Sequence, residues 1–163
     1  MLLEEYFQLR VEFAPGSLIP TLPLRLNYIL WLEDLITSLK LADTADVRGI
    51  DIGCGSSCIY TLLGARKNSW HMYALESNDV NLEFARSNVK CNNLEHLVEI
   101  FKQTNKLIIF KDFFDSKPNV NFHFVYVIHH FTTQRYPILF TRIHEMKISE
   151  RRHIIATQDM MRS

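Results

Sequence analysis

The feature that most constrains the fold is a glycine-containing turn between an apolar strand and a helix. The stretch "VRGIDIGCGSSCIYTLLG" begins as a short apolar run and breaks at Gly53 and Gly55. Glycine lets the backbone turn sharply and approach a ligand, because no Cβ stands in the way. The next apolar run, "WHMYALE", ends on an acid, Glu76. This order of strand, turn, helix and strand predicts an α/β domain with a mainly parallel sheet.

The remaining segments extend this pattern. Apolar residues at three- and four-residue steps predict an amphipathic helix over about 26–40, with Leu30, Leu32, Leu35, Ile36 and Leu39 on one face. Residues 56–64 predict a short helix, with Ser56 or Ser57 as its N-cap and Gly64 as its stop.

A longer helix follows in "SNDVNLEFARSNVKCNN", which opens with capping residues and stops at Asn92-Asn93. Its apolar side is predicted to hold Val80, Phe84, Ala85 and Val89. Three later runs, "LVEIF", "KLIIF" and "NFHFVYVI", are strand candidates. The expected fold class is therefore α/β of the Rossmann type, and the periodic signal fades after Phe131.

Composition excludes several classes of protein. The 163 residues fit one domain, and 18 basic residues balance 18 acidic ones, so the chain lacks the basic excess usual for nucleic-acid binding. A local basic patch could still bind RNA. The three cysteines form no C-x-x-C pair, which favours a reducing compartment over disulfides or structural zinc.

The sequence also predicts where the protein resides. No apolar run approaches the ~18–20 residues of a membrane span. The start "MLLEEYFQLR" carries acids where a signal peptide would carry bases. We expect a nuclear or cytoplasmic protein that is neither secreted nor inserted in a membrane.

The turn and the acid after it predict an adenosine cofactor. Glu76 follows the turn at about the 20-residue distance at which an acid binds ribose hydroxyls in dinucleotide folds. A nicotinamide site would need a third glycine or alanine where Cys58 stands, whereas D-x-G-x-G suits S-adenosylmethionine. A glycine turn in a ligand-free α/β domain remains the alternative. Cys54 and Cys58 are expected to be small buried residues, with a redox or metal role as the other possibility.

Three stretches carry a family resemblance. "LIPTLPLRLNYILWLEDLI", "RGIDIGCGSSCIYTLLGA" and "NVKCNNL" resemble the methyltransferase-like 16 family, eukaryotic relatives of the bacterial 23S ribosomal RNA adenine-N6 methyltransferases. The resemblance runs from about Leu2 to Phe131. It implies a class I S-adenosylmethionine-dependent methyltransferase fold and methyl transfer to adenine N6 in structured RNA such as U6 small nuclear RNA. We accordingly expect a cofactor-binding domain over 1–131 and a divergent segment over 132–163.

The resemblance also implies which residues bind the cofactor. The family's cofactor contacts correspond to Arg25, Gly53, Ser57 and Glu76. Arg25 would pair with the methionine carboxylate, a group that the guanidinium fork fits with two hydrogen bonds.

The family's catalytic tetrapeptide N-P-P-F corresponds to Ile128-His129-His130-Phe131. The adenine amine is a poor nucleophile, and the asparagine oxygen and a proline carbonyl accept its hydrogens while the aromatic ring stacks on the flipped base. Phe131 is retained, but Ile128 cannot accept a hydrogen bond, and without prolines nothing stiffens the loop.

Two interpretations of this position stay open. The chain is either an RNA adenine-N6 methyltransferase, or a non-catalytic relative that binds S-adenosylmethionine or a partner and transfers nothing. A metal or general-base site is disfavoured, because adjacent residues on a strand, such as His129 and His130, point to opposite faces.

Overall fold

The computed structural model describes residues 2–17, 19–38, 46–103, 109–118, 120–127 and 138–139. In that part of the chain a five-stranded sheet has the order β3-β2-β1-β4-β5. The strands are β1 (Arg48–Ile52), β2 (His71–Glu76), β3 (Val98–Lys102), β4 (Phe124–Val127) and β5 (Ile138–Leu139). The helices are α1 (Leu2–Phe7), α2 (Leu22–Ser38), α3 (Ile59–Asn68), α4 (Asp79–Cys91) and α5 (Ile109–Ser116).

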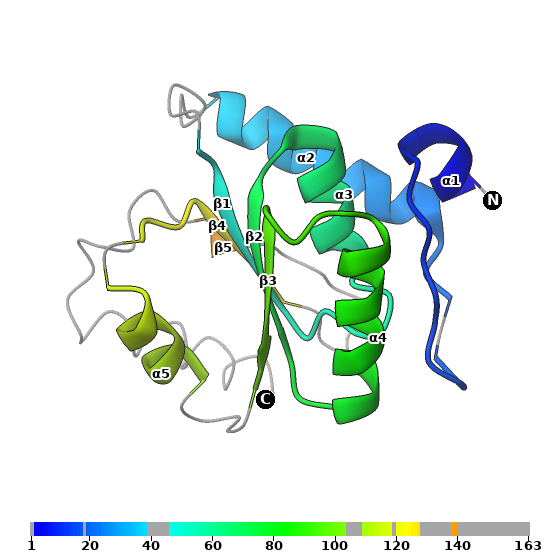
Figure 1. The fold of residues 1–163 in the computed structure, drawn as a ribbon. Coiled ribbons are helices and arrows are strands. Elements are labelled where there is room, and N and C mark those ends of the chain that lie inside the picture. The colour runs from blue at the N-terminus through cyan, green and yellow to red at the C-terminus, as the bar shows by residue number, and fades with distance from the viewer. Residues whose placement is uncertain are drawn as a thin grey trace, which may run out of the picture.

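The sheet is doubly wound. Strands β1 to β4 pair in parallel, and only the short β5 runs antiparallel, against β4. Helices α1 to α4 lie on one side of the sheet and α5 lies on the other (Figure 1). The strand order reverses between β1 and β4, and open α/β sheets bind ligands beyond the carboxyl ends of the strands at such a switch point. The predicted Rossmann-like α/β fold is confirmed.

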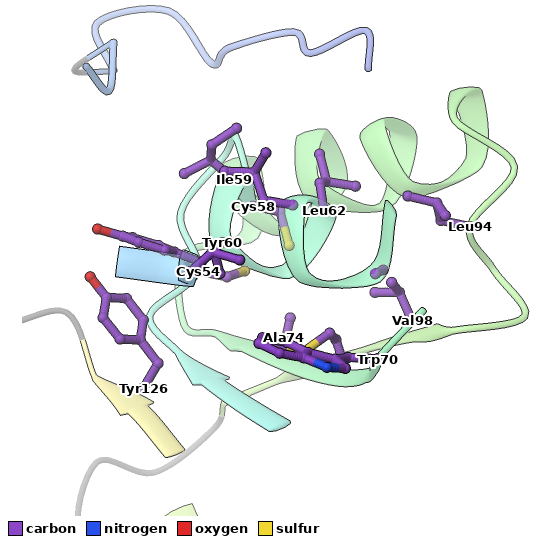
Figure 2. Packing of buried hydrophobic residues seen from close by; sticks show 14 of the residues in the cluster. Cys54, Cys58, Ile59, Tyr60, Leu62, Trp70, Ala74, Leu94, Val98 and Tyr126 are labelled. Atoms are coloured by element: carbon purple, nitrogen blue, oxygen red, sulfur yellow. The ribbon is translucent and has the colours of Figure 1, made fainter. Parts of the chain in front are cut away.

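Two apolar clusters hold the sheet, one on each face. Along β4, Phe124 and Tyr126 belong to the cluster beneath α2, α3 and α4, whereas Val125 belongs to the cluster beneath α5. This alternation is the two-residue period of a strand buried on both faces. Figure 2 shows part of the first cluster, with Leu62 on α3, Leu94 after α4, and Ala74 on β2.

The helix predictions are confirmed in outline and wrong in detail. Helix α2 starts at Leu22, and it buries Ile29, Leu32 and Ile36, while Leu30 is 38% exposed. In α4 the Asn78 side chain accepts the Asn81 N–H as an N-cap, and the helix ends at Cys91 as expected. Its buried residues are Leu82, Ala85, Asn88 and Val89, so Val80 and Phe84 do not form the core side.

Helix α3 begins and ends differently from the prediction. Its N-cap is Cys58, which has a left-handed backbone (φ 49°) and makes no capping hydrogen bond through its side chain. The helix passes through Gly64 and stops at Ser69, also left-handed. Gly64 serves packing instead: an added Cβ would lie 3.1 Å from the Trp70 ring.

One strand prediction is wrong. The run "KLIIF" was expected to form a strand, but its last two residues, Ile109 and Phe110, begin helix α5. A short apolar run suits a buried strand or a helix that packs on a sheet equally well, and periodicity cannot separate them.

Candidate cofactor site

The glycine turn lies across the carboxyl end of β2. Gly53 and Gly55 have φ values of 73° and 69°, in the left-handed region that glycine adopts without strain. The N–H groups of Gly53 and Cys54 both donate to the Leu75 carbonyl, at 2.8 and 3.1 Å. The turn is therefore held beside Glu76, the next residue of β2.

Glu76 is fixed in place by backbone donors. Its Oε2 accepts the Gly55 N–H, and its Oε1 accepts the N–H groups of Ser77 and Asn78, all at 2.8 Å. The residue is 6% exposed. A carboxylate has about four acceptor positions, so these three bonds leave one, on Oε2. The side chain is thus oriented and can still accept a hydroxyl at that oxygen.

Space for a ligand lies beside the turn. A Cβ built on Gly55 would meet no atom within 4 Å. Ser57 lies on the same turn and is partly exposed. Three of the predicted cofactor residues, Gly53, Ser57 and Glu76, therefore lie on this turn or directly against it.

Arg25 reaches this region from α2. Its Nη1 donates to the Tyr60 hydroxyl at 2.7 Å, and its guanidinium carbon lies 5.3 Å from the centre of the Tyr60 ring. Tyr60 is in the first turn of α3, directly after the glycine turn. The Arg25 Nε is buried and has no hydrogen-bond partner in the described structure.

Asp51 opens the D-x-G-x-G pattern, but the sequence analysis assigned its side chain no role of its own. It is fully buried in β1, and its Oδ2 accepts the Thr61 hydroxyl at 2.8 Å, while Oδ1 has no partner within the described residues. Burial raises the pKa of Asp51 to about 7; the Thr61 hydrogen bonds oppose this shift and the Glu76 charge adds to it. The available signal was an acid between two isoleucines, Ile50 and Ile52, in a predicted strand.

Three tyrosine rings pack together next to Asp51. The Tyr60 and Tyr126 ring centres lie 4.1 Å apart, and those of Tyr28 and Tyr126 lie 4.6 Å apart. Figure 2 shows Tyr60 and Tyr126 with their hydroxyls at the same end of the rings. Burial raises the pKa values of Tyr28 and Tyr126. Both hydroxyl oxygens are buried, and neither makes a hydrogen bond in the described structure. Helices α2 and α3 thus meet β4 at the switch point.

The two cysteines of the turn are core residues. Cys54 and Cys58 are 3% and 0% exposed. Contact with the Cys58 thiol, and then burial, raises the pKa of Cys54 well above its ordinary value. A reactive cysteine needs a lowered thiol pKa and exposure, so the buried-residue interpretation is favoured.

The expected catalytic tetrapeptide, Ile128-His129-His130-Phe131, lies outside the described residues, directly after β4. The last residue of β4, Val127, pairs with Ile52, the residue before the glycine turn. Within the described ranges no group of three or more His, Cys, Asp or Glu side chains could hold a metal ion.

Comparison with known proteins then identifies the family. A family model described as RNA methyltransferase matches residues 1–135. The chain belongs to this family. The resemblance to methyltransferase-like 16 proteins is confirmed by curated relatives. The U6 small nuclear RNA (adenine-(43)-N(6))-methyltransferase of Drosophila melanogaster is 62% identical over 71% of this chain and 37% of that protein. The human RNA N(6)-adenosine-methyltransferase METTL16 is 46% identical over 66% of this chain and 19% of that protein.

Solved structures agree with the sequence comparisons. The N-terminal domain of human METTL16 in complex with SAH matches with a TM-score of 0.72 and 34% identity, over 98% of this chain and 58% of that chain. The human METTL16 catalytic domain in complex with the MAT2A 3′UTR hairpin 1 matches with a TM-score of 0.66 and 42% identity. The match covers 77% of this chain and 40% of that chain. The chain spans about two fifths or less of the curated relatives named above. In its described part, no helix has the length and apolar character to cross a membrane.

Proposed function

We propose that this chain carries the S-adenosylmethionine site of an RNA adenine-N6 methyltransferase. The observation that carries the proposal is the bond from the Gly55 N–H to Glu76 Oε2. It joins a glycine turn and a strand-end acid beside the switch point of the sheet. The relatives' names and the SAH-bound human domain support the choice of cofactor and reaction.

The residues present fit the groups of this cofactor. Glu76 would accept a ribose hydroxyl at Oε2, and Gly53, Gly55 and Ser57 would line the adenosine side of the site. Arg25 would bind the methionine carboxylate, because its buried Nε lacks a partner and its Nη1 is held by Tyr60. The cofactor supplies an electrophilic methyl group on a sulfonium.

The reaction replaces one bond to the methyl carbon with another. Adenine N6 forms the new carbon–nitrogen bond, the carbon–sulfur bond breaks, and N6 loses a proton. The chain contributes Phe131 to stack on the base, by resemblance to the family. We further propose that 1–131 form the cofactor-binding domain, that 132–163 are divergent, and that the protein acts in the nucleus or cytoplasm.

A second function is favoured by one specific observation. Ile128-His129-His130 stand where the family has Asn-Pro-Pro. Removing a hydrogen bond made in the transition state costs about 100- to 1000-fold in rate, and loss of positioning adds to that. The alternative is a chain that binds S-adenosylmethionine, or a partner, without transferring the methyl group.

Calorimetry with S-adenosylmethionine tests the cofactor site. The wild-type chain should bind, Glu76→Ala should lose most of its affinity, and the control Glu83→Ala, an exposed acid of α4, should bind like wild type. Thermal melts of the three proteins separate lost affinity from lost folding. No binding by the wild-type chain at millimolar ligand would refute the site. Methyl transfer to a U6-like RNA hairpin then separates the two functions.

A further inference from the structure

The stretch "NVKCNNL" supplies two asparagines that bind the N-terminal arm, which we define as residues 9–17. Asn92 Oδ1 accepts the Arg10 N–H at 2.8 Å, and its Nδ2 donates to the Arg10 carbonyl at 2.6 Å. Asn88 binds Glu12 in the same way, with both distances 2.8 Å. The arm follows α1 and runs beside α4 (Figure 1).

The geometry of these four bonds is that of a β-ladder. Each amide exchanges two hydrogen bonds with one backbone residue, as paired strand residues do. Asn88 and Asn92 are one helical turn apart, a rise of about 6 Å. Their partners Arg10 and Glu12 are two residues apart in an extended segment, which spans roughly 6.6 Å. The matched spacing lets α4 bind the arm in a single register.

Asn88 also binds the glycine turn. Its Nδ2 donates to the Ser56 carbonyl at 2.9 Å, and the whole residue is fully buried. Ser56 stands between Gly55 and Ser57, and its hydroxyl donates to the Ser17 hydroxyl at 3.0 Å. The arm and the glycine turn are thus joined by two connections, one through the Asn88 side chain and one between the hydroxyls of Ser17 and Ser56.

Asn92 offers a natural comparison. Apart from the arm, its Nδ2 donates to the Asn88 carbonyl at 2.7 Å, within the same helix. No hydrogen bond in the described structure joins Asn92 to the glycine turn. The two asparagines therefore hold the same arm, and they differ in whether they also hold Ser56.

We propose that Asn88 is a positioning residue for the cofactor site. Two glycines with left-handed backbone leave the turn free to adopt other conformations. By holding the Ser56 carbonyl, Asn88 keeps the Gly55 N–H aimed at Glu76 and keeps Ser57 on the ligand side. The effect on cofactor affinity rests on the proposed function, whereas the effect on the turn itself does not.

The same side chain couples the arm to the ligand. Any ligand that orders the glycine turn must also oppose opening of the arm, because coupling between two binding events is reciprocal. We expect S-adenosylmethionine to slow hydrogen exchange of the Glu12 amide, whose acceptor is Asn88.

The test compares Asn88→Ala with Asn92→Ala in the full chain. Without ligand, residue-resolved hydrogen exchange of Asn88→Ala should speed up at the amides of both Glu12 and Gly55. Asn92→Ala should speed up exchange at Arg10 and leave Gly55 unchanged. With S-adenosylmethionine, calorimetry should show affinity about tenfold or more lower for Asn88→Ala, since a buried hydrogen-bond partner is lost, and within about twofold of wild type for Asn92→Ala.

Two outcomes would overturn the proposal. One is an unchanged Gly55 amide in Asn88→Ala, and the other is an equal loss of affinity in both variants, which would indicate a purely structural role. If Asn88→Ala does not fold, Asn88→Asp replaces it, because it keeps the volume and the Oδ1 acceptor of the Glu12 N–H and loses the amide donor to the Ser56 and Glu12 carbonyls. If wild type binds no cofactor, the proposed function fails, and the ligand-free exchange at Gly55 still decides the role of Asn88.

Discussion

Buried polar atoms without partners are the most informative single-residue feature of this site. Buried donors and acceptors in folded proteins are nearly always paired, yet the Arg25 Nε and Asp51 Oδ1 have no partner in the described structure. They lie on elements that meet at the start of α3, and one belongs to a cation, the other to an acid whose pKa burial raises to about 7. A ligand with both a carboxylate and an ammonium group, as the methionine end of the proposed cofactor has, would suit the two.

The Tyr60 hydroxyl is predicted to orient Arg25 for that ligand. Tyr60→Phe removes the acceptor of the 2.7 Å bond and leaves the ring in place. We expect cofactor affinity to fall about fivefold to tenfold, and the free energy of unfolding to fall by about 1 kcal/mol. Calorimetry and urea unfolding measure the two effects.

Tyr28→Phe is the matched control, because the Tyr28 hydroxyl is buried and has no hydrogen-bond partner in the described structure. Its removal should leave stability unchanged or slightly higher. Equal losses in both variants would contradict the role assigned to Tyr60.

Asp51 is predicted to make the free energy of unfolding fall as the pH rises from about 4 to about 7. Its pKa is raised by burial from 3.8 to about 7, so between these values the folded state binds more protons than the unfolded state. The contribution of Asp51 to stability is fully present below about pH 4 and is lost as the pH rises to about 7. Its size is on the order of a few kcal/mol.

Asp51→Asn lacks this titration and can keep the bond from Thr61. Relative to wild type, the variant should therefore gain stability between pH 4 and pH 7 and change no further above that. Urea unfolding of both proteins across this range measures the difference. A difference that is constant with pH would show that Asp51 has an ordinary pKa.

At the scale of elements, the sequence predicted those features that depend only on residues close together in the chain. The glycine turn and the acid ending β2 follow from apolar runs and glycine positions that are local in the chain. The start of α3 was missed because Cys58 caps it through a left-handed backbone, without a side-chain bond. The helix at Ile109 was missed because a short apolar run has no distinctive period.

Close packing between β1 and β4 predicts a severe effect at Gly49. A Cβ there would overlap three ring atoms of Phe124, which is 1% exposed. Gly49→Ala should lower the free energy of unfolding by about 3 kcal/mol or more, at the upper end of overpacking costs. In a Phe124→Leu background the added cost should shrink, and urea unfolding of the four proteins of this cycle measures the coupling.

Gly64→Ala in α3 is the comparison. Its Cβ would lie 3.1 Å from the Trp70 ring, and a gain in helix propensity of about 1 kcal/mol opposes the strain. The net change should lie within about 1 kcal/mol of zero. A larger loss at Gly64 than at Gly49 would contradict this account of the packing.

At the scale of the whole molecule, the sites depend on contacts that no local pattern reveals. Arg25 meets Tyr60 across 35 positions of the chain, and Asn88 meets Glu12 across 76. The family resemblance named Arg25 as a cofactor residue, but nothing in the sequence showed which side chain holds it. The described residues supply the glycine turn, the strand-end acid and Arg25, which together make up the proposed cofactor site.

The last prediction concerns the position that follows β4. If Ile128, His129 and His130 account for lost catalysis, then the triple variant Ile128→Asn, His129→Pro, His130→Pro restores the family's acceptors and a stiff loop. We expect its affinity for S-adenosylmethionine to match wild type, since these residues are not among the proposed cofactor contacts. Methyl incorporation into a U6-like hairpin should rise by about 100-fold or more over wild type.

Adding Phe131→Ala to the triple variant should abolish the gain, because the flipped base then loses its stacking partner. Wild-type turnover equal to that of the triple variant would instead show that the chain aligns its substrate without the tetrapeptide.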